Sequence, residues 1–390
     1  LKFETPFLMI HTKGGSVPFI SKEVFDYYPN EPYALSISIS NTEHMEEAVK
    51  LYDKGIVNFV GHGNQNCLTF LTVKDTGEEC PTGSHEKGSL PIFTRCGKVN
   101  ITPERFMNIV KAFKPDFYHN LCDGDTNVDS SKKRILKSVE RSDSFFNKCL
   151  EIHKESDGLK KSGFIGAVEG GYNQTQRNES IKYLTEHFDE MNGFLIDGLH
   201  LNGGKVMELK SDSLQDIVKN VCNQLPEDKF RMLLGAYTPL VTLEMIKLGI
   251  DIFDSSFPYL KTIKNRAIVF TFDLNEAKNS EFELDITDSK YKDDFRPFLK
   301  DCQCLACQNH TRAYSNHLFN TKEMLGPILL MIHNLHHYFE FFKSIRQHIA
   351  DDKLEKLIEC IRIQQIDKQS VIIDNDNVVE LKKSNKVLSN

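Results

Sequence analysis

Residues 302–307 read Cys302-Gln303-Cys304-Leu305-Ala306-Cys307, and a Leu-rich segment further along the chain ends in His333. Three thiols within six residues can turn toward one ion, and a distant imidazole can complete a tetrahedral site. The pattern therefore predicts a zinc site made of Cys302, Cys304, Cys307 and His333. Four protein ligands leave no position for water, so the predicted role is structural. The alternative is three reduced thiols and an ordinary core histidine, which such tight clustering disfavours.

Two further histidines, His336 and His337, follow among aromatic residues. Positions i, i+3 and i+4 of a helix share one face, so a larger metal cluster is conceivable. We expect only His333 to face the metal, and the other two histidines to be structural or exposed.

Composition excludes several classes of protein. The chain has 390 residues, with 48 Lys and Arg against 55 Asp and Glu and a formal charge of −7, so bulk charge does not indicate an RNA-binding protein. Any nucleic-acid surface must be a local basic patch. Ten Cys lack paired spacing, no apolar run reaches membrane-spanning length, and no secretory signal is visible. These features predict a cytoplasmic location.

Short apolar runs alternate with segments of helical periodicity over most of the chain. Helices are predicted at 42–54, 102–114 and 128–155, the second with Thr102 as N-cap and Pro103 in the first turn. This β-then-α order favours a parallel barrel over an open sheet, although periodicity alone does not decide between them. The candidate strands are 7–10, 33–39, 56–60, 68–73, 117–121, 163–168, 194–196, 232–234, 250–253 and 267–272.

The predicted domain order has four parts. Residues 1–273 form a barrel core, interrupted at 74–98 by a Gly- and Pro-containing loop or hairpin. Residues 274–300 are a charged insertion, and 301–350 are the zinc-binding subdomain with a closing helix. Residues 351–390 begin with the end of a helix, and the polar composition after about residue 365 predicts a disordered tail.

The Cys-x-Cys-x-x-Cys segment, the Thr-Arg-Ala-Tyr that follows it and the His-Asn pair in a Leu-rich helix resemble the zinc subdomain of the tRNA-guanine transglycosylases. The resemblance implies a (β/α)8 TIM barrel with an inserted C-terminal zinc-binding subdomain. It also implies a role in exchanging guanine for queuine at wobble position 34 of tRNAs with GUN anticodons. Further landmarks of the resemblance are the segments 115–117, 122–124, 166–171, 193–198 and 253–259.

Acidic residues stand at the ends of three predicted strands: Asp123, Glu169 and Asp254. Displacement at a ribose carbon can use one carboxylate as nucleophile and a second carboxyl group for a proton. By resemblance, Asp254 matches the family's nucleophile; the alternative is a strand-end acid that only caps backbone groups. Asp251 lies three residues earlier, so we expect the two carboxylates not to share a pocket.

The catalytic signature of the family, Asp-Ser-Gly-Gly, is absent from the chain, and Phe70 is predicted near the position of its carboxylate. By resemblance, Asp123, Glu169 and Gly198 are remnants of the base pocket. Glu169 stands where catalytic members have Gln, and Asp197 replaces a Gly. An ionised carboxylate only accepts hydrogen bonds, whereas an amide both donates and accepts.

The leading hypothesis is therefore a non-catalytic subunit that binds tRNA and forms a heterodimer with a catalytic subunit. One alternative is an active transglycosylase that uses Asp254 as nucleophile; another is a barrel that only organises other proteins. The resemblance also implies a homodimer when the chain is alone, and peripheral association with the mitochondrial outer membrane. The candidate phosphate contacts, for which ordinary solvated charge is the alternative, are Lys261, Lys264, Arg266 and Arg312.

Overall fold

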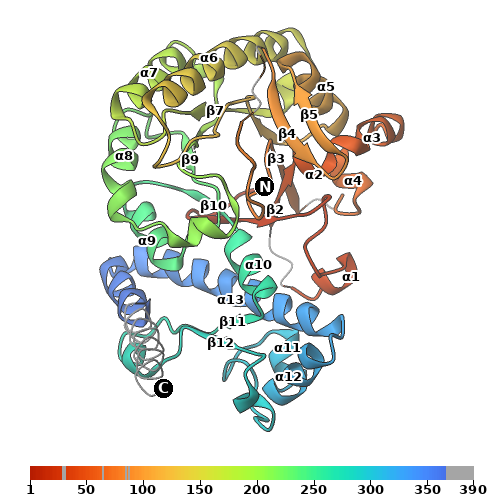
Figure 1. Cartoon of the computed structure of the whole chain (residues 1–390), viewed down its shortest axis with the longest axis vertical. Helices are drawn as coiled ribbons and strands as arrows, with labels where there is room; N and C mark the ends of the chain where they lie inside the picture. Colours follow the sequence, from red (N-terminus) through yellow and green to blue (C-terminus); the bar gives the residue numbers. More distant parts are fainter. Residues whose placement is uncertain (29–31, 64–65, 84–85, 87, 366–390) are drawn as a thin grey trace, which may run out of the picture.

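The computed structural model describes residues 1–28, 32–63, 66–83, 86 and 88–365. Eight parallel strands close into a barrel in the order β1-β10-β9-β8-β7-β6-β3-β2 (Figure 1). This confirms the predicted TIM barrel. The barrel strands are β1 (Phe7–His11), β2 (Tyr33–Ser38), β3 (Cys67–Thr72), β6 (Phe117–His119), β7 (Gly163–Val168), β8 (Gly193–Ile196), β9 (Phe230–Met232) and β10 (Ile252–Asp254).

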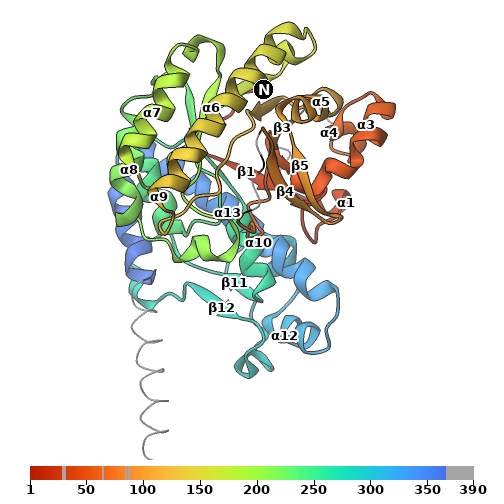
Figure 2. The ribbon, with the colours of Figure 1, turned by 45° about the horizontal axis from the view of Figure 1, so that its top comes forward.

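Helices connect successive strands and cover the outside of the barrel (Figures 1 and 2). The helix predicted from Thr102 is confirmed, because the Thr102 hydroxyl accepts a hydrogen bond from the Arg105 N–H at 3.3 Å and Pro103 is the first helical residue. Helices between or directly after the barrel strands are α1 (Lys22–Phe25), α2 (Ile39–Thr42), α3 (Glu46–Tyr52), α4 (Ile56–Phe59), α5 (Pro103–Phe113), α6 (Lys132–Glu155), α7 (Gln174–Thr185), α8 (Asp212–Cys222), α9 (Pro239–Lys247) and α10 (Ser256–Ile263).

The interior of the barrel is a packed core. Each strand contributes apolar side chains to it, and Phe70 stacks on Phe117 with 4.8 Å between ring centroids. Phe70 is therefore a core residue inside the barrel, which corrects its predicted position near a reactive site. The buried members of this interior core are Met9, Ala34, Phe70, Ile165, Leu195, Met232, Leu234 and Ile252.

Two predicted strands are not part of the barrel. Residues 56–59 form helix α4, in which only Ile56 is buried, whereas a barrel strand would bury both of its faces. The predicted strand at 267–272 overlaps β11 (Arg266–Ile268), which pairs antiparallel with β12 (Glu283–Asp285) outside the barrel. The predicted irregular segment at 74–98 contains the start of a hairpin, β4 (Leu90–Thr94) and β5 (Gly97–Ile101), which lies beside α2 in Figure 1.

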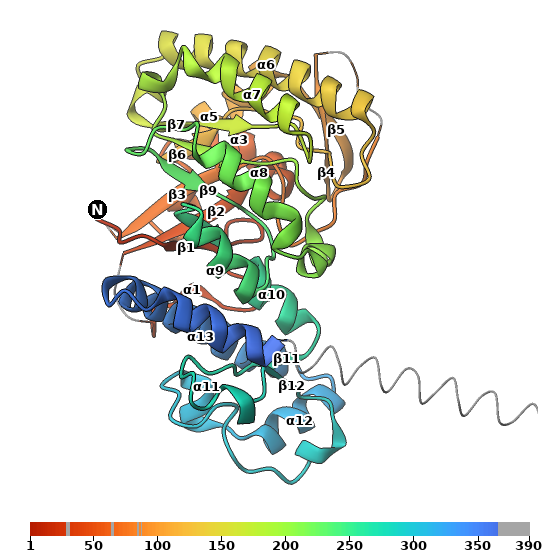
Figure 3. The ribbon, with the colours of Figure 1, turned by 90° about the vertical axis from the view of Figure 1, so that its left-hand side faces the viewer.

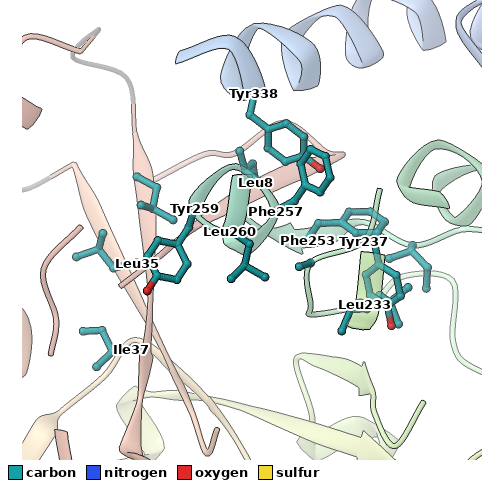
Figure 4. Close-up of a cluster of buried hydrophobic side chains, with 14 of the residues drawn as sticks. Leu8, Leu35, Ile37, Leu233, Tyr237, Phe253, Phe257, Tyr259, Leu260 and Tyr338 are labelled. Atoms are coloured by element: carbon teal, nitrogen blue, oxygen red, sulfur yellow. The ribbon is translucent and has the colours of Figure 1, made fainter. Parts of the chain in front are cut away.

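Residues 266–350 form a C-terminal module. It packs against one side of the barrel through α13 (Leu325–Ala350), which lies between the barrel and β11–β12 (Figure 3). In Figure 4, Tyr338 of α13 points toward Phe257 of α10, and the two ring centroids are 5.6 Å apart. The module also contains α11 (Leu305–Asn309) and α12 (Arg312–Asn320). Because β12 lies within 274–300, the predicted insertion is a part of this module.

The chain continues past α13 as a helical stretch at 354–365. The predicted disordered tail lies outside the described residues. Within the described part of the chain, no helix has the length and apolar character needed to span a membrane.

Candidate metal centre and barrel cleft

The four predicted metal ligands come together between α11 and α13. Cys304 caps the N-terminus of α11, where its sulfur accepts a hydrogen bond from the Cys307 N–H at 3.3 Å, so the local turn itself brings these two thiols to one side. Cys302 precedes the turn, and His333 reaches it from α13. All four ligand atoms lie within 4.8 Å of one another.

The distances suit a tetrahedral ion. The His333 Nδ1 atom lies 3.7 Å from Sγ of Cys302, 3.7 Å from Sγ of Cys304 and 3.3 Å from Sγ of Cys307. Ligands at metal–sulfur and metal–nitrogen distances typical of zinc would be separated by about 3.5 Å in a tetrahedron. The other ring nitrogen, Nε2, lies 2.9 Å from the Ile268 carbonyl oxygen and can donate to it, which orients the ring as in known metal sites. The group can therefore hold one metal ion.

The neighbouring histidine His337 is a core residue, not a ligand. It is buried, and its ring packs against Phe270 and Phe272 with centroid distances of 4.6 and 5.2 Å. His336 lies outside the group of four ligands and contacts it through a hydrogen bond to Cys302.

Arg312 supports the metal loop from within the module. Its guanidinium donates to the carbonyl oxygens of Pro297 and Phe298, both at 2.8 Å, and forms an ion pair with Asp294 at 3.1 Å. These contacts connect the segment before the cysteines to α12. The side chain therefore has a structural role within the module.

The other candidate phosphate contacts differ in their surroundings. Lys261 lies 2.6 Å from a Glu283 carboxylate oxygen, and Arg266 lies 3.1 Å from Asp285, so both charges are neutralised within the module. Lys264 is exposed and has no ion pair within the described residues. Of the four candidates, Lys264 has the charge most available to a phosphate.

Asp254 ends β10 at the mouth of the barrel but is only 2% exposed. One of its oxygens accepts the Gly235 N–H and the other accepts the Ser256 N–H, both at 2.7 Å. Asp251 precedes the same strand and accepts the Arg231 N–H at 2.8 Å, so the two carboxylates lie at opposite ends of β10. Asp254 therefore caps backbone groups in this structure.

Asp123, which follows β6, is fully buried and bound by two arginines from α6. The Arg134 guanidinium contacts both carboxylate oxygens, at 3.0 and 2.5 Å, and Arg141 forms a second ion pair. Sequence reasoning identified Asp123 but missed both arginines. Their spacing of seven residues places them on one helix face, but nothing local indicates that this face meets Asp123.

Beyond the end of β3, the first ionisable side chain is Lys74. It forms a buried ion pair with Asp125. Burial is the largest single effect and would lower the pKa of Lys74, but the charge and hydrogen bond of Asp125, together with Cys80 and Asp197, outweigh it and raise the pKa above its usual value. A half-buried cation, paired with a buried carboxylate, therefore lies just beyond the end of this strand.

The next residue, Asp75, is the first carboxylate after β3, and it also has partners within the protein. It lies 2.6 Å from Nε2 of His11, accepts a hydrogen bond from Asn41 at 2.7 Å and pairs with Lys13 at 3.1 Å. Burial alone would raise its pKa, but these partners hold the pKa of Asp75 well below its usual value. Sequence reasoning did not single out this residue.

Glu169, which follows β7, is fully buried. Burial, with a smaller contribution from the negative charge of Asp197, raises the pKa of Glu169 well above its usual value. A raised pKa favours the neutral carboxyl group, which can both donate and accept hydrogen bonds, as an amide can. Gly198 makes room for it, because a Cβ atom there would lie 2.5 Å from Oε2 of Glu169.

A narrow cleft remains at the mouth of the barrel, with a volume of about 40 Å³. This is room for a few water molecules, far below the volume of a typical ligand pocket. The cleft is lined by Thr72, Val73, Lys74, Thr76, Cys80, His119, Cys122, Gly124, Asp125, Leu195, Asp197, His200, Leu201, Asn202 and Leu234.

Comparison with known proteins gives a consistent result. A family model described as queuine tRNA-ribosyltransferase matches residues 1–365. A protein of Aedes aegypti named queuine tRNA-ribosyltransferase accessory subunit 2 is 45% identical over 98% of this chain and 92% of its own length. Proteins with the same name from Culex quinquefasciatus and Anopheles gambiae are 47% and 48% identical, over 97% and 92% of this chain and 87% and 83% of their own lengths. The chain therefore belongs to the queuine tRNA-ribosyltransferase family.

Proposed function

We propose that the chain is the non-catalytic subunit of a heterodimeric queuine tRNA-ribosyltransferase. In this role it binds a catalytic partner and a tRNA with a GUN anticodon, and supports exchange of guanine for queuine at the wobble position. The name accessory subunit 2, carried by relatives similar to the chain over nearly its whole length, supports this assignment.

The observation that carries the proposal is that three carboxylates at the barrel mouth already have internal hydrogen-bond or ion-pair partners. Asp254 is held by two backbone N–H groups, Asp123 by two arginines, and Asp75 by His11, Lys13 and Asn41. A nucleophile must reach the ribose carbon, and a carboxyl group that moves a proton must reach the base. In this chain, all three groups already have internal partners.

The Cys3His group supports a structural zinc in this proposal. Its thiols and imidazole match the ligands zinc prefers, and the four ligands complete its usual tetrahedron. When bound, the ion would cross-link the loop at 302–307 to α13. No water position remains, so its contribution is to stability and to the shape of the module.

Fewer of the four candidate phosphate contacts have an available charge than the sequence suggests. Lys264, at the end of α10, is exposed and unpaired within the described residues, whereas Lys261, Arg266 and Arg312 already have acidic or carbonyl partners. A phosphate would have to compete with Glu283 and Asp285 for two of these charges. We therefore assign the main phosphate contact among the four to Lys264.

The competing function is an active transglycosylase with Asp254 as nucleophile. The specific observation in its favour is that a second carboxylate, Asp75, lies just beyond the end of β3. Its buried network with His11 weighs against it, because freeing the carboxylate would break several hydrogen bonds at once.

A base-exchange assay separates the two functions. Labelled queuine incorporation into a GUN-anticodon tRNA is measured with the metal-loaded protein alone, with the catalytic subunit alone, and with both. We expect no incorporation by this chain alone, strong incorporation by the mixture, and no effect of Asp254→Asn in this chain beyond any change in its folding. Incorporation by this chain alone, abolished by Asp254→Asn and by Asp75→Asn, would establish the competing function.

A further inference from the structure

A second group of metal-ligating side chains lies at the barrel mouth, apart from the Cys3His group. Cys122 follows β6, Glu169 follows β7 and Asp197 follows β8, so three neighbouring parallel strands each deliver one ligand to the same edge. Their ligand atoms lie within 4.8 Å of one another, and Sγ of Cys122 is 3.8 Å from Oδ2 of Asp197. The arrangement depends on barrel closure and has no motif in the sequence.

The Glu169 carboxyl group is fully buried, and its polar side-chain contact is the thiol of Cys122, another member of the group. Within the described residues, neither of its oxygens has a hydrogen bond of ordinary geometry. The nearby Arg177 donates instead to the carbonyl oxygens of Gly171 and Val168. Leaving a buried carboxyl group unsatisfied is costly, so its position needs a ligand, a proton or a water molecule to explain it.

Two glycines hold open the space around the carboxylates. A Cβ atom on Gly124 would lie 2.1 Å from Oδ2 of Asp197, and one on Gly198 would lie 2.5 Å from Oε2 of Glu169. Cys122 and Asp197 also line the cleft of about 40 Å³, which provides a path from solvent. That volume admits an ion and a water molecule but not a purine.

We propose that Cys122, Glu169 and Asp197 form a second metal site, which takes one divalent ion of the zinc type. A thiolate selects such an ion over magnesium or calcium, and three protein ligands leave a fourth position for a water molecule from the cleft. On binding, the Cys122 thiol and the Glu169 carboxyl group release their protons to solvent.

The charges around the proposed site nearly balance the charge of the ion and its three ligands. Three anionic ligands and a divalent cation carry a net charge of about −1, and the buried Arg177 nearby offsets it. The other nearby cations are already paired, Lys74 with Asp125, and Arg134 and Arg141 with Asp123. Without the ion, a proton retained on Glu169 would balance the same charges, and this is the alternative that the experiment must distinguish.

The test counts metal ions in the full-length protein. The chain is equilibrated with excess Zn²⁺ or Co²⁺, separated from free metal by gel filtration, and analysed by elemental mass spectrometry. With Co²⁺, the near-ultraviolet thiolate-to-metal absorption reports how many sulfurs bind. We expect two ions per chain in the wild-type protein, with the second contributing the signal of one thiolate. One ion per chain at saturating metal would overturn the proposal.

Variants identify the ligands. Cys122→Ser should retain one ion and lose the single-thiolate signal, while Cys149→Ser, which alters a buried thiol on α6, should retain both ions. Glu169→Gln keeps the side-chain shape and removes an unsatisfied acid, so it should fold and bind the second ion at least about tenfold more weakly. Unchanged affinity in Glu169→Gln, or two ions in Cys122→Ser, would contradict the site. The assay needs neither tRNA nor a partner, so its outcome is independent of the proposed accessory role.

Discussion

Asp123 is fully buried, and the guanidinium groups of Arg134 and Arg141 bind its carboxylate. The resemblance to catalytic relatives identifies this acid as a remnant of the base pocket. In the folded chain it is instead the centre of an ion cluster that joins the end of β6 to α6. Two charge-assisted partners leave it little capacity to recognise a base.

Removing both arginines should destabilise the protein. In Arg134→Met/Arg141→Met, the buried Asp123 loses both cations, and breaking a buried ion cluster on one side costs about 3 to 5 kcal/mol. Urea unfolding measures the free energy of unfolding. Adding Asp123→Asn should restore most of the loss, because the uncompensated charge is then gone. Lys182→Met, which alters an exposed ion pair with Glu179, serves as the control and should change stability by less than about 1 kcal/mol.

The ionisation of Asp75 should make the free energy of unfolding depend on pH at acidic pH. Its pKa is held below the unfolded value of about 3.9, so its stabilisation is complete above about pH 5 and is lost as the pH falls through the unfolded and then the folded pKa. Relative to Asp75→Asn, the stability of the wild-type protein should be greatest above about pH 5, and the difference should shrink steadily as the pH falls below about 4.

Urea unfolding of both proteins across this pH range measures the difference. Asp228→Asn, at an exposed position, is the control and should follow the wild-type protein throughout. A constant difference between wild type and Asp75→Asn would show that the carboxylate network with His11, Asn41 and Lys13 does not titrate with folding.

Helix α13 connects the barrel to the module through one buried side chain as well as through its apolar face. The Asn334 oxygen accepts the Ile268 N–H at 2.9 Å, and its amide donates to Thr262 Oγ1 at 2.9 Å and to the Arg266 carbonyl at 2.8 Å. The adjacent His333 bonds the same strand through the Ile268 carbonyl. The His-Asn pair therefore holds α13 against β11 through hydrogen bonds to both its N–H and its carbonyl groups.

Asn334→Ala should cost about 3 kcal/mol, because it leaves several buried backbone and hydroxyl groups without partners. Thermal and urea unfolding of the metal-loaded protein measure the loss. Gln347→Ala removes an exposed amide from the same helix and should have an effect within about 0.5 kcal/mol. Equal effects of the two substitutions would mean that the Asn334 hydrogen bonds do not stabilise the contact.

The elements themselves were largely predictable. Eight of the ten candidate strands overlap barrel strands, because a strand buried on both faces is a short, continuous apolar run. The segments 56–60 and 267–272 are also short, mostly apolar runs. Their different outcomes depend on which partners are nearby: α4 packs on the outside of the barrel, and β11 pairs with β12.

At the scale of the whole molecule, the eight barrel strands contain none of the metal ligands, while the module consists of the long helix α13 and several short elements. Within the module, β11 and β12 are three residues each, and α11 has five residues. Elements this short need a cross-link or a large apolar contact to remain ordered. We therefore expect the two parts of the chain to respond differently to loss of the metal.

Chelation should loosen the module and leave the barrel intact. After treatment with a strong chelator, amide hydrogen exchange should rise over residues 266–320 and remain slow in β2 and β3. Cys304→Ser should reproduce this pattern without chelator, and Cys222→Ser, a buried thiol outside the module, should not. Uniform exchange across barrel and module would show that the metal stabilises the entire chain instead.

The sequence by itself determined the metal ligands, the alternating order of strands and helices, and the absence of the family's Asp-Ser-Gly-Gly signature. Each of these depends on residue types at short spacing or on the resemblance that they carry. The tertiary structure alone decided which runs enter the barrel, which cations are already paired, and that Cys122, Glu169 and Asp197 meet. These outcomes involve partners tens of residues apart, and only closure of the barrel brings such groups to one edge. The same closure buries Asp254 and brings His11 to Asp75, while the packing of α6 brings two arginines to Asp123, so the chemistry left to these carboxylates is a property of the fold.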